Sequence, residues 1–329
     1  MEPAPPFRRR WPWLTADLQT IRNVLPGRLA GIPPESGQRF EIPLRDGSGD
    51  RLVARYHPGY GAAPAIILVP GLTGCEASRH VLQAAGAFLA AGHPAIRLNL
   101  RGSPPGRTLA RGHYHMGRVR DLADACLAAA ELDPAIRERG IVVLGYSMGG
   151  ALALRLAAAP YLPATVMAAV SISAPLDLAA AADRVARLRN RFYERWLLAR
   201  LREETEPVWR RAPAAVQNAV AAARHIRDFD DALTAGEAGF RDAADYYASC
   251  SPARSLGALR VPALIVHADD DPWVPPPSVA ASSRLRVVVT RGGGHVGFHG
   301  KGSRLPWYLA AAAGFVRASA DACRAPAAP

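Results

Sequence analysis

The stretch Ile141-Val142-Val143-Leu144-Gly145-Tyr146-Ser147-Met148-Gly149-Gly150 decides how this chain folds. Four apolar residues, most of them β-branched, lead into the pattern Gly-x-Ser-x-Gly, and the sequence that follows is rich in helix-forming alanine and leucine. A strand, a sharp turn and a helix are the context in which a serine hydroxyl is held above the edge of a sheet. We therefore predict that Ser147 is a nucleophile on such a turn. Gly145 and Gly149 are small enough to let the strand and the helix meet there.

The segments on either side of this stretch alternate between apolar strands and helices. Residues 39–44 and 51–56 alternate around Asp-Gly-Ser-Gly, which predicts a hairpin. Helices are expected over 77–91 and from about 117 to 132. Further apolar strands are expected over Ala65 to Val69, Ala95 to Leu100, Val166 to Ile172, Ala263 to His267 and Leu285 to Val289. This order favours an α/β fold with a mainly parallel sheet covered by helices on both faces.

The alternation of predicted strands and helices divides the chain into an arm, a core and an insertion. Residues 1–35 are rich in proline and tryptophan and predict an arm across the domain, although Phe7, Trp11 and Trp13 beside three arginines could instead anchor it to a membrane surface. Residues 36–175 and 255–329 form the predicted core. Residues 176–254 are helical by composition and are either a lateral elaboration or a lid. We expect a lid, because loops at the carboxyl ends of parallel strands surround the ligand crevice.

Composition argues against several classes of partner. The net charge is +12. Every basic side chain except Lys301 is an arginine, and the arginines are spread over the whole chain, so no nucleic-acid partner is predicted. The four cysteines lack the spacing of metal ligands. We therefore expect free thiols, as in a protein of the reducing cytoplasm. His113 and His115 form a pair without a suitably spaced third ligand, so neither a metal nor a cofactor is expected.

A serine nucleophile needs an imidazole to take its proton and a carboxylate to orient the imidazole, in the chain order Ser, Asp, His. Asp269-Asp270-Asp271 follows one predicted strand, and His295 lies in a glycine-flanked loop after the last strand. Each feature alone is consistent with a capped turn or a surface loop. Together with the turn at Ser147 they predict a catalytic triad, in which we choose Asp271 because it lies farthest beyond the strand end.

The oxyanion of the reaction is expected to bind two backbone N–H groups. One belongs to Met148, which directly follows the nucleophile, and the other to Leu72 in the loop after the strand 65–69. Gly71 and Gly74 would let this loop approach closely.

Several stretches resemble the α/β-hydrolase superfamily and, within it, the YheT-like hydrolases, also called the AB hydrolase 4 family. They are Leu18-Gln19-Thr20-Ile21, Tyr114-His115-Met116-Gly117 with Asp121, Asn190-Arg191-Phe192-Tyr193, the run from Ile226 to Ala235 with Gly239-Phe240 and Tyr246-Tyr247, and Gly293-Gly294-His295-Val296-Gly297-Phe298. Two positions depart from the family, since Asp17 and Pro70 stand where it usually has histidine. The resemblance implies an α/β-hydrolase fold with a helical lid. It also implies a serine carboxylic-ester hydrolase for small-molecule esters of short or medium acyl chains, with Ser147, Asp271 and His295 as its triad.

Two other classes of function stay open at this point. A lipid-directed hydrolase, of lysophospholipase or monoacylglycerol type, or an acyltransferase at a membrane surface would fit the basic charge and the aromatic arm. A binding protein on a hydrolase scaffold is disfavoured by the complete triad. We also expect the inner face of the lid to set acyl-chain preference, the alternative being that its apolar residues only anchor it. These residues are Trp196, Leu197, Leu198, Leu201, Phe229, Phe240, Tyr246 and Tyr247.

Overall fold

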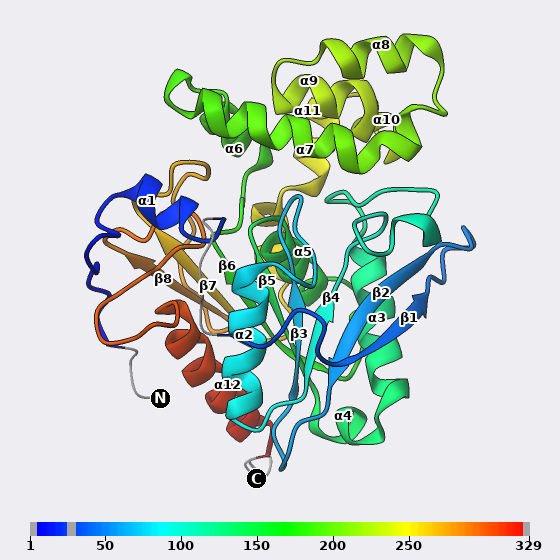
Figure 1. Cartoon of the computed structure of the whole chain (residues 1–329). Helices are drawn as coiled ribbons and strands as arrows, with labels where there is room; N and C mark the ends of the chain where they lie inside the picture. The colour runs from blue at the N-terminus through cyan, green and yellow to red at the C-terminus, as the bar shows by residue number, and fades with distance from the viewer. Residues whose placement is uncertain (1–4, 25–30, 325–329) are drawn as a thin grey trace.

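A single eight-stranded sheet organises the protein, as seen in a computed structural model that describes residues 5–24 and 31–324 (Figure 1). The strand order is β1-β2-β4-β3-β5-β6-β7-β8. Strand β2 is antiparallel to β1 and β4, and all other pairs are parallel. The strands are β1 Gln38–Pro43, β2 Arg51–His57, β3 Ala65–Val69, β4 Ala95–Leu98, β5 Ile141–Tyr146, β6 Val166–Ile172, β7 Ala263–Ala268 and β8 Leu285–Thr290. The predicted α/β class and mainly parallel sheet are confirmed, although β4 ends two residues before the predicted end.

Helices cover both faces of this sheet because its central strands are apolar on both sides. Ile66 and Leu68 of β3 pack into the cluster that contains α2 and α12, whereas Ile67 and Val69 pack into the cluster that contains α3 and α5. The alternation follows from the two-residue period of a strand. The core helices are α2 Arg79–Ala90, α3 Val119–Leu132, α4 Pro134–Arg139, α5 Met148–Ala157 and α12 Tyr308–Arg324, with a short 3₁₀ helix at Arg107–Leu109. Helices α2 and α3 each begin two residues later than predicted.

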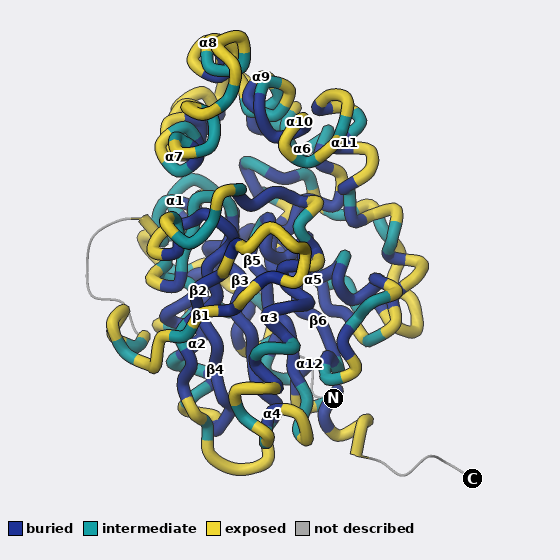
Figure 2. Tube along the Cα trace, turned by 90° about the vertical axis from the view of Figure 1, so that its right-hand side faces the viewer, coloured by how far each residue is buried: buried dark blue, intermediate teal, exposed yellow. Residues whose placement is uncertain are grey.

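Residues 176–254, here called the helical insertion, lie between β6 and β7 and form a layer over one end of the sheet (Figure 1). Its helices are α6 Leu178–Val185, α7 Arg191–Trp209, α8 Ala214–Ala222, α9 Ile226–Phe229, α10 Ala235–Glu237 and α11 Ala243–Cys250, with a 3₁₀ turn at Leu188–Asn190 and a π-helical turn at Asp230–Thr234. A 3₁₀ helix at Pro252–Ala258 leads back to β7. The insertion has a small apolar cluster of its own, around Leu198, Val220 and Phe229. Exposed residues lie on its outer helices (Figure 2).

Residues 5–21 of the predicted arm pack against the carboxyl-terminal part of the core, and residues 31–35 contact α2, β2 and β4. Helix α1 (Ala16–Ile21), which the sequence analysis did not predict, lies beside the loop after β8. The Phe7 ring lies 6.0 Å from the rings of both Phe298 and Trp307. Residues 1–4 and 25–30 of the arm, and residues 325–329 of the predicted core, lie outside the described residues.

Three further structural findings concern helix length, cysteines and possible metal ligands. None of the helices in the described ranges is long and apolar enough to cross a membrane. The four cysteines are free thiols. Within residues 5–24 and 31–324, no group of three or more histidine, cysteine or acidic side chains is arranged to hold a metal ion.

Candidate active site

Ser147 sits on a strained turn between β5 and α5. Its φ angle is 50°, a left-handed value that a side chain with a Cβ adopts at a cost of about 1 to 3 kcal/mol. A Cβ at Gly145 would lie 2.1 Å from the carbonyl oxygen of Gly149, and a Cβ at Gly149 would lie 2.3 Å from that of Pro70. Only glycine fits at either position, so the two glycines let strand and helix meet with Ser147 at the apex.

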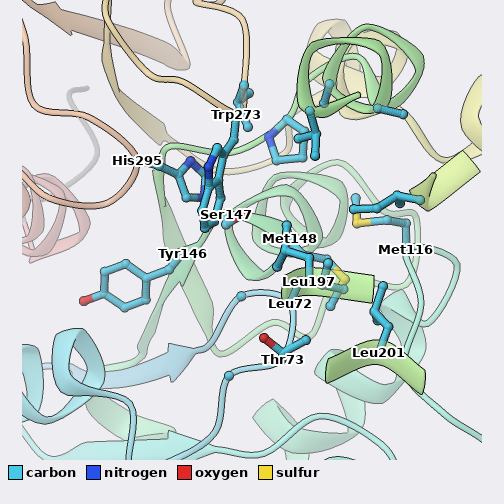
Figure 3. A pocket seen from close by; sticks show the side chains of 18 of the residues that line it. Leu72, Thr73, Met116, Tyr146, Ser147, Met148, Leu197, Leu201, Trp273 and His295 are labelled. Atoms are coloured by element: carbon cyan, nitrogen blue, oxygen red, sulfur yellow. The ribbon is translucent and has the colours of Figure 1, made fainter. Parts of the chain in front are cut away.

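The hydroxyl of Ser147 is open to a cavity. Its backbone N–H donates to the carbonyl oxygen of Ile172 at 2.8 Å, which ties the turn to β6. Its Oγ atom forms no hydrogen bond within the described part of the chain, and both Ser147 and His295 line the same pocket (Figure 3). Nucleophile and base often draw together only when substrate binds.

The three consecutive aspartates after β7 have three different partners. Asp269 Oδ1 accepts the N–H of Gly292 at 2.7 Å, and Asp270 Oδ1 accepts the N–H of Gly294 at 2.9 Å. Only Asp271 reaches the imidazole: its Oδ2 lies 2.8 Å from Nδ1 of His295. The first two residues therefore shape the loop that carries the histidine, and the third contacts its ring.

Asp271 is fully buried and its carboxylate is well supported. Its Oδ1 accepts the backbone N–H groups of Trp273 and Val274 at 2.8 and 3.0 Å. Burial alone would raise the pKa of Asp271, but the charge of His295 and its hydrogen bond, with these backbone donors, hold the pKa below its ordinary value. An ionised Asp271 accepts the proton on Nδ1 of His295, which leaves Nε2 of the ring free to accept one.

The helical insertion holds the loop that carries Asp271. Arg184 on α6 donates to the carbonyl oxygen of Asp271 from Nε at 3.0 Å and from Nη2 at 2.7 Å. The amide of Asn190 donates to the carbonyl oxygen of Pro272 at 2.7 Å and to that of Arg184 at 2.8 Å. Sequence reasoning assigned no role to Arg184 and quoted Asn190 only as part of a resembling stretch.

His295 is held from three sides. Its ring lies against Trp273, with centroids 4.6 Å apart and planes 34° from parallel. Its backbone N–H donates to Thr20 Oγ1 at 2.9 Å, and the next N–H, of Val296, donates to Ser173 Oγ at 3.1 Å. Val296 has a φ of 59°, so the loop turns sharply just after the histidine.

Gln19 and Thr20 of α1 also support the site, although sequence reasoning gave them no role and quoted them only within a resembling stretch. The Gln19 amide donates to the carbonyl oxygen of His299 and accepts the N–H of His299 at 2.6 Å, while Thr20 accepts the N–H of His295. A Cβ at Gly294 would lie 2.4 Å from the carbonyl oxygen of Ala16 in the same helix. The glycines around His295 were the available signal, since they allow this close approach.

The two predicted oxyanion donors flank Ser147. A Cβ at Gly71 would lie 3.1 Å from that of Ser147, so the loop carrying Leu72 runs directly beside Ser147. Within the described residues, neither the N–H of Leu72 nor that of Met148 donates a hydrogen bond. Both groups are thus available to an oxygen in the pocket.

The oxyanion loop is tied to the helical insertion through Tyr114. The N–H of Thr73, a residue with a φ of 57°, donates to the Tyr114 hydroxyl at 3.0 Å. That hydroxyl donates in turn to Glu204 Oε2 on α7 at 2.7 Å. The insertion therefore contacts the site on two sides. Arg184 holds the loop that carries Asp271, and Glu204 holds, through Tyr114, the loop that carries Leu72.

The cavity between the sheet and the helical insertion has a volume of about 310 Å³. This falls at the lower end of the range for pockets that bind small molecules. Its apolar wall comes from Leu178, Ala182, Val185, Leu197, Leu201, Ile226 and Phe229 of the insertion. Trp196, Tyr246 and Tyr247 also line it, whereas Leu198 and Phe240 do not.

One end of the cavity carries buried polar groups. His113 and His115 line it, and burial, followed by the charges of neighbours, lowers the pKa of His113 to about 4 and that of His115 to about 2. The N–H of Gly117 donates to Nδ1 of His115 at 3.1 Å, so the neutral ring carries its hydrogen on Nε2. Burial raises the pKa of Asp230 to about 6, although its carboxylate accepts the Tyr247 hydroxyl at 2.6 Å.

Comparisons with known proteins agree with this architecture. Residues 64–301 match the model of the alpha/beta hydrolase fold family. The putative esterase YheT of Escherichia coli is 30% identical over 271 residues, which cover 80% of this chain and 78% of that protein. Phospholipase ABHD3 of Mus musculus is 25% identical over 88% of this chain and 72% of its own length. A Pyrococcus furiosus esterase structure superposes with a TM-score of 0.57 at 15% identity, covering 88% of this chain and 95% of that chain, which shows likeness of fold.

Proposed function

The chain belongs to the α/β-hydrolase family and is YheT-like within it, and on that premise we propose that it is a serine carboxylic-ester hydrolase. The observation that carries this proposal is the hydrogen bond between Asp271 and His295, formed in the same pocket that Ser147 lines. A buried carboxylate that orients an imidazole toward an otherwise unbonded serine is the arrangement that activates a hydroxyl for acyl transfer.

The reaction follows from the placement of these groups. Ser147 Oγ attacks the carbonyl carbon of the ester while Nε2 of His295 takes its proton, and the charge of Asp271 stabilises the imidazolium. The N–H groups of Leu72 and Met148 bind the oxyanion of the tetrahedral intermediate. The intermediate collapses to an acyl-serine, and the departing alcohol takes the proton from His295. Water then repeats the attack on the acyl carbon and releases the acid and free Ser147.

The substrate that we propose is an ester with a short or medium acyl chain. The cavity of about 310 Å³ has room for a small ester, and the helical insertion supplies an apolar wall. Each acyl methylene buried against such a wall contributes about 0.8 kcal/mol. In this proposal the insertion acts as a lid that sets acyl-chain preference.

Replacing Ser147 tests the proposal. Hydrolysis of p-nitrophenyl butyrate by Ser147→Ala should fall on the order of 10³-fold or more, because only binding and the oxyanion donors would remain. The melting temperature of the variant should stay close to that of the wild type. A correctly folded Ser147→Ala protein that keeps near wild-type turnover would exclude this function.

A lipid-directed hydrolase at a membrane surface is the second candidate, favoured by one observation. Large apolar side chains are exposed around the arm and the start of α7: Trp11 and Val24, then Leu188, Phe192 and Trp196. Val24 and Trp196 also line the pocket, so a membrane docked here would face the site. The exposed Arg187 and Arg191 next to Leu188 and Phe192 would favour anionic lipid.

Vesicle binding separates this candidate from hydrolysis in solution. Phe192→Ser should weaken flotation with phosphatidylglycerol vesicles, whereas Tyr60→Ser, at an exposed aromatic residue outside the pocket lining, should not. If the wild-type protein does not float with such vesicles, the membrane-surface function is wrong.

A further inference from the structure

Arg79 lines the pocket without an acidic partner, and the charge of a second arginine, Arg22, interacts with it from outside the lining. Arg79 begins α2 and lines the cavity, and Arg22 directly follows α1. Neither forms an ion pair among the described residues. Nη1 of Arg79 and Nε of Arg22 are buried and have no hydrogen-bond partner. Buried donors of this kind are costly when they remain unsatisfied, so each is expected to have a function.

The positive charges at this end repel one another. Burial, and then the charges of Arg79 and Arg10, lower the pKa of Arg22. Arg10 donates from Nη1 to the carbonyl oxygen of Ser303, which leaves its charge uncompensated. An anion bound beside Arg79 would reduce this repulsion.

The surrounding groups also suit an anion. Ser78, Arg79 and His80, at the start of α2, all line the pocket, so the N-terminus of a twelve-residue helix faces it. The free N–H groups and the dipole of such a terminus attract negative charge. Asn23 uses its amide nitrogen on the carbonyl oxygen of Val296, and its Oδ1 is buried without a partner. The Asn23 oxygen repels an anion, but it can accept a hydrogen bond from a hydroxyl group of the same ligand.

This end of the pocket is close to the reacting atoms. His80 lines the same pocket as Ser147 and His295. The His80 ring also packs edge-on against Tyr146, with centroids 4.5 Å apart, directly before Ser147 in the chain. A group bound by Arg79 would therefore belong to the same small molecule whose ester carbonyl reaches Ser147.

We propose that Arg79, supported by the nearby charge of Arg22, forms an anion subsite, which binds a carboxylate or a phosphate carried by the ester substrate. The inference rests on the proposed esterase function and narrows its substrates to anionic esters. The guanidinium fork matches the paired oxygens of either group, and such charge-assisted bonds are roughly twice as strong as neutral ones. The carboxylate or phosphate could sit on the acyl side or on the alcohol side of the ester.

Matched pairs of esters test the subsite. On the acyl side, p-nitrophenyl pentanoate is compared with p-nitrophenyl hydrogen glutarate, which has the same chain length and a terminal carboxylate. On the alcohol side, 1-butanoylglycerol is compared with 1-butanoylglycerol 3-phosphate. The wild type should prefer the anionic member of at least one pair, and the pair it prefers identifies the group and its place. Arg79→Gln and Arg22→Gln should each lower kcat/KM for that anionic ester by roughly 10- to 100-fold and leave the neutral ester unchanged.

The control variant is Arg254→Gln, which removes the same charge at an exposed arginine outside the pocket. This variant should change kcat/KM for neither ester of a pair by more than about twofold, because a distant surface charge is screened. Equal losses on anionic and neutral esters in Arg79→Gln, or no anionic preference in the wild type, would overturn the subsite. Ser147-dependent hydrolysis of the neutral esters would then still support the proposed function.

A binding measurement covers the case in which no ester is turned over. Inorganic phosphate or glutarate should raise the melting temperature of the wild type and of Arg254→Gln, but not that of Arg79→Gln. An equal rise in all three proteins, or no rise in the wild type, would contradict the subsite without reference to catalysis.

Discussion

The hydroxyl oxygen of Thr20 lies 2.9 Å from the backbone nitrogen of His295, although 275 residues of chain separate them. The same hydroxyl donates to the carbonyl oxygen of Ala16 at 2.8 Å, so its orientation is set within α1. The N-terminal helix therefore takes part in placing the histidine that we propose as the base.

Thr20→Val should impair this placement while keeping the shape of the side chain. It leaves the buried N–H of His295 without an acceptor, at a cost of about 1 to 3 kcal/mol in unfolding free energy. We expect kcat to fall about tenfold, because a small shift of the base weakens proton transfer. Thr20→Ser retains the oxygen and should keep most of the activity. Equal kcat values in the valine and serine variants would show that α1 does not position His295.

The three aspartates should differ sharply when each is changed to asparagine. Asp271→Asn should lower kcat by about 10⁴-fold, because the amide favours the wrong tautomer of His295. Asp269→Asn and Asp270→Asn loosen the loop at Gly292 and Gly294 and should mainly lower the melting temperature. Rates of p-nitrophenyl butyrate hydrolysis test the assignment. A larger loss of rate in Asp269→Asn or Asp270→Asn than in Asp271→Asn would show that Asp271 is not the triad acid.

The sequence predicts those parts of the fold and site whose signals are local. Strands β3 and β6 match their predicted bounds, because each is an apolar run that glycine or proline closes. The turn at Ser147 is also local, since Gly145 and Gly149 mark it. The contact between Asp271 and His295 could be proposed only from chain order, because it depends on β7 and β8 being neighbours in the sheet.

Contacts across the molecule lie beyond such local signals. The contact of Thr20 with His295, and the link from Thr73 through Tyr114 to Glu204, join segments whose sequences carry no trace of one another. They form only after the arm and the helical insertion have packed against the core. Arg79 likewise has no ion-pair partner among residues 5–24 and 31–324, and no sequence pattern records such an arrangement in space.

Residues of the helical insertion that line the pocket should set acyl-chain preference, and buried neighbours in the insertion that do not line it should not. Leu197 and Leu201 line the pocket, and the equally buried Leu198 does not. Leu198 and Leu201 both pack into the insertion's own cluster, so only pocket lining separates them. Leu197→Ala and Leu201→Ala should change the ratio of octanoate to butyrate hydrolysis several-fold, since each lost methylene contact is worth about 0.8 kcal/mol. Leu198→Ala should lower the melting temperature and leave the ratio unchanged. The same ratio in all three variants would mean that the insertion is only structural.

Buried neutral histidines should make the fold labile to acid. Burial, with nearby arginine charges, lowers the pKa of His57 and His113 to about 4 and that of His299 to about 3. The unfolded chain binds protons at these rings below about pH 6.5, while the folded chain does not. Unfolding free energy should therefore be highest above pH 6.5 and fall as the pH drops toward 4.

His113→Leu isolates one of these rings, because the ring nitrogens of His113 form no hydrogen bonds. The variant should lose stability less steeply with acid, by about 1.4 kcal/mol per pH unit between pH 6 and pH 4.5. Urea denaturation at a series of pH values measures this slope, with the two proteins compared first at pH 8. Parallel curves for the two proteins would show that His113 is protonated in the folded state.

Mass spectrometry of the protein after reaction with a fluorophosphonate tests the central claim most directly. We predict one covalent adduct per chain, located on the peptide that contains Ser147, and no adduct on Ser147→Ala. Labelling should also slow markedly in Asp271→Asn, because the serine is activated through His295. An adduct on a different residue, or undiminished labelling of the Ser147→Ala protein, would contradict the account.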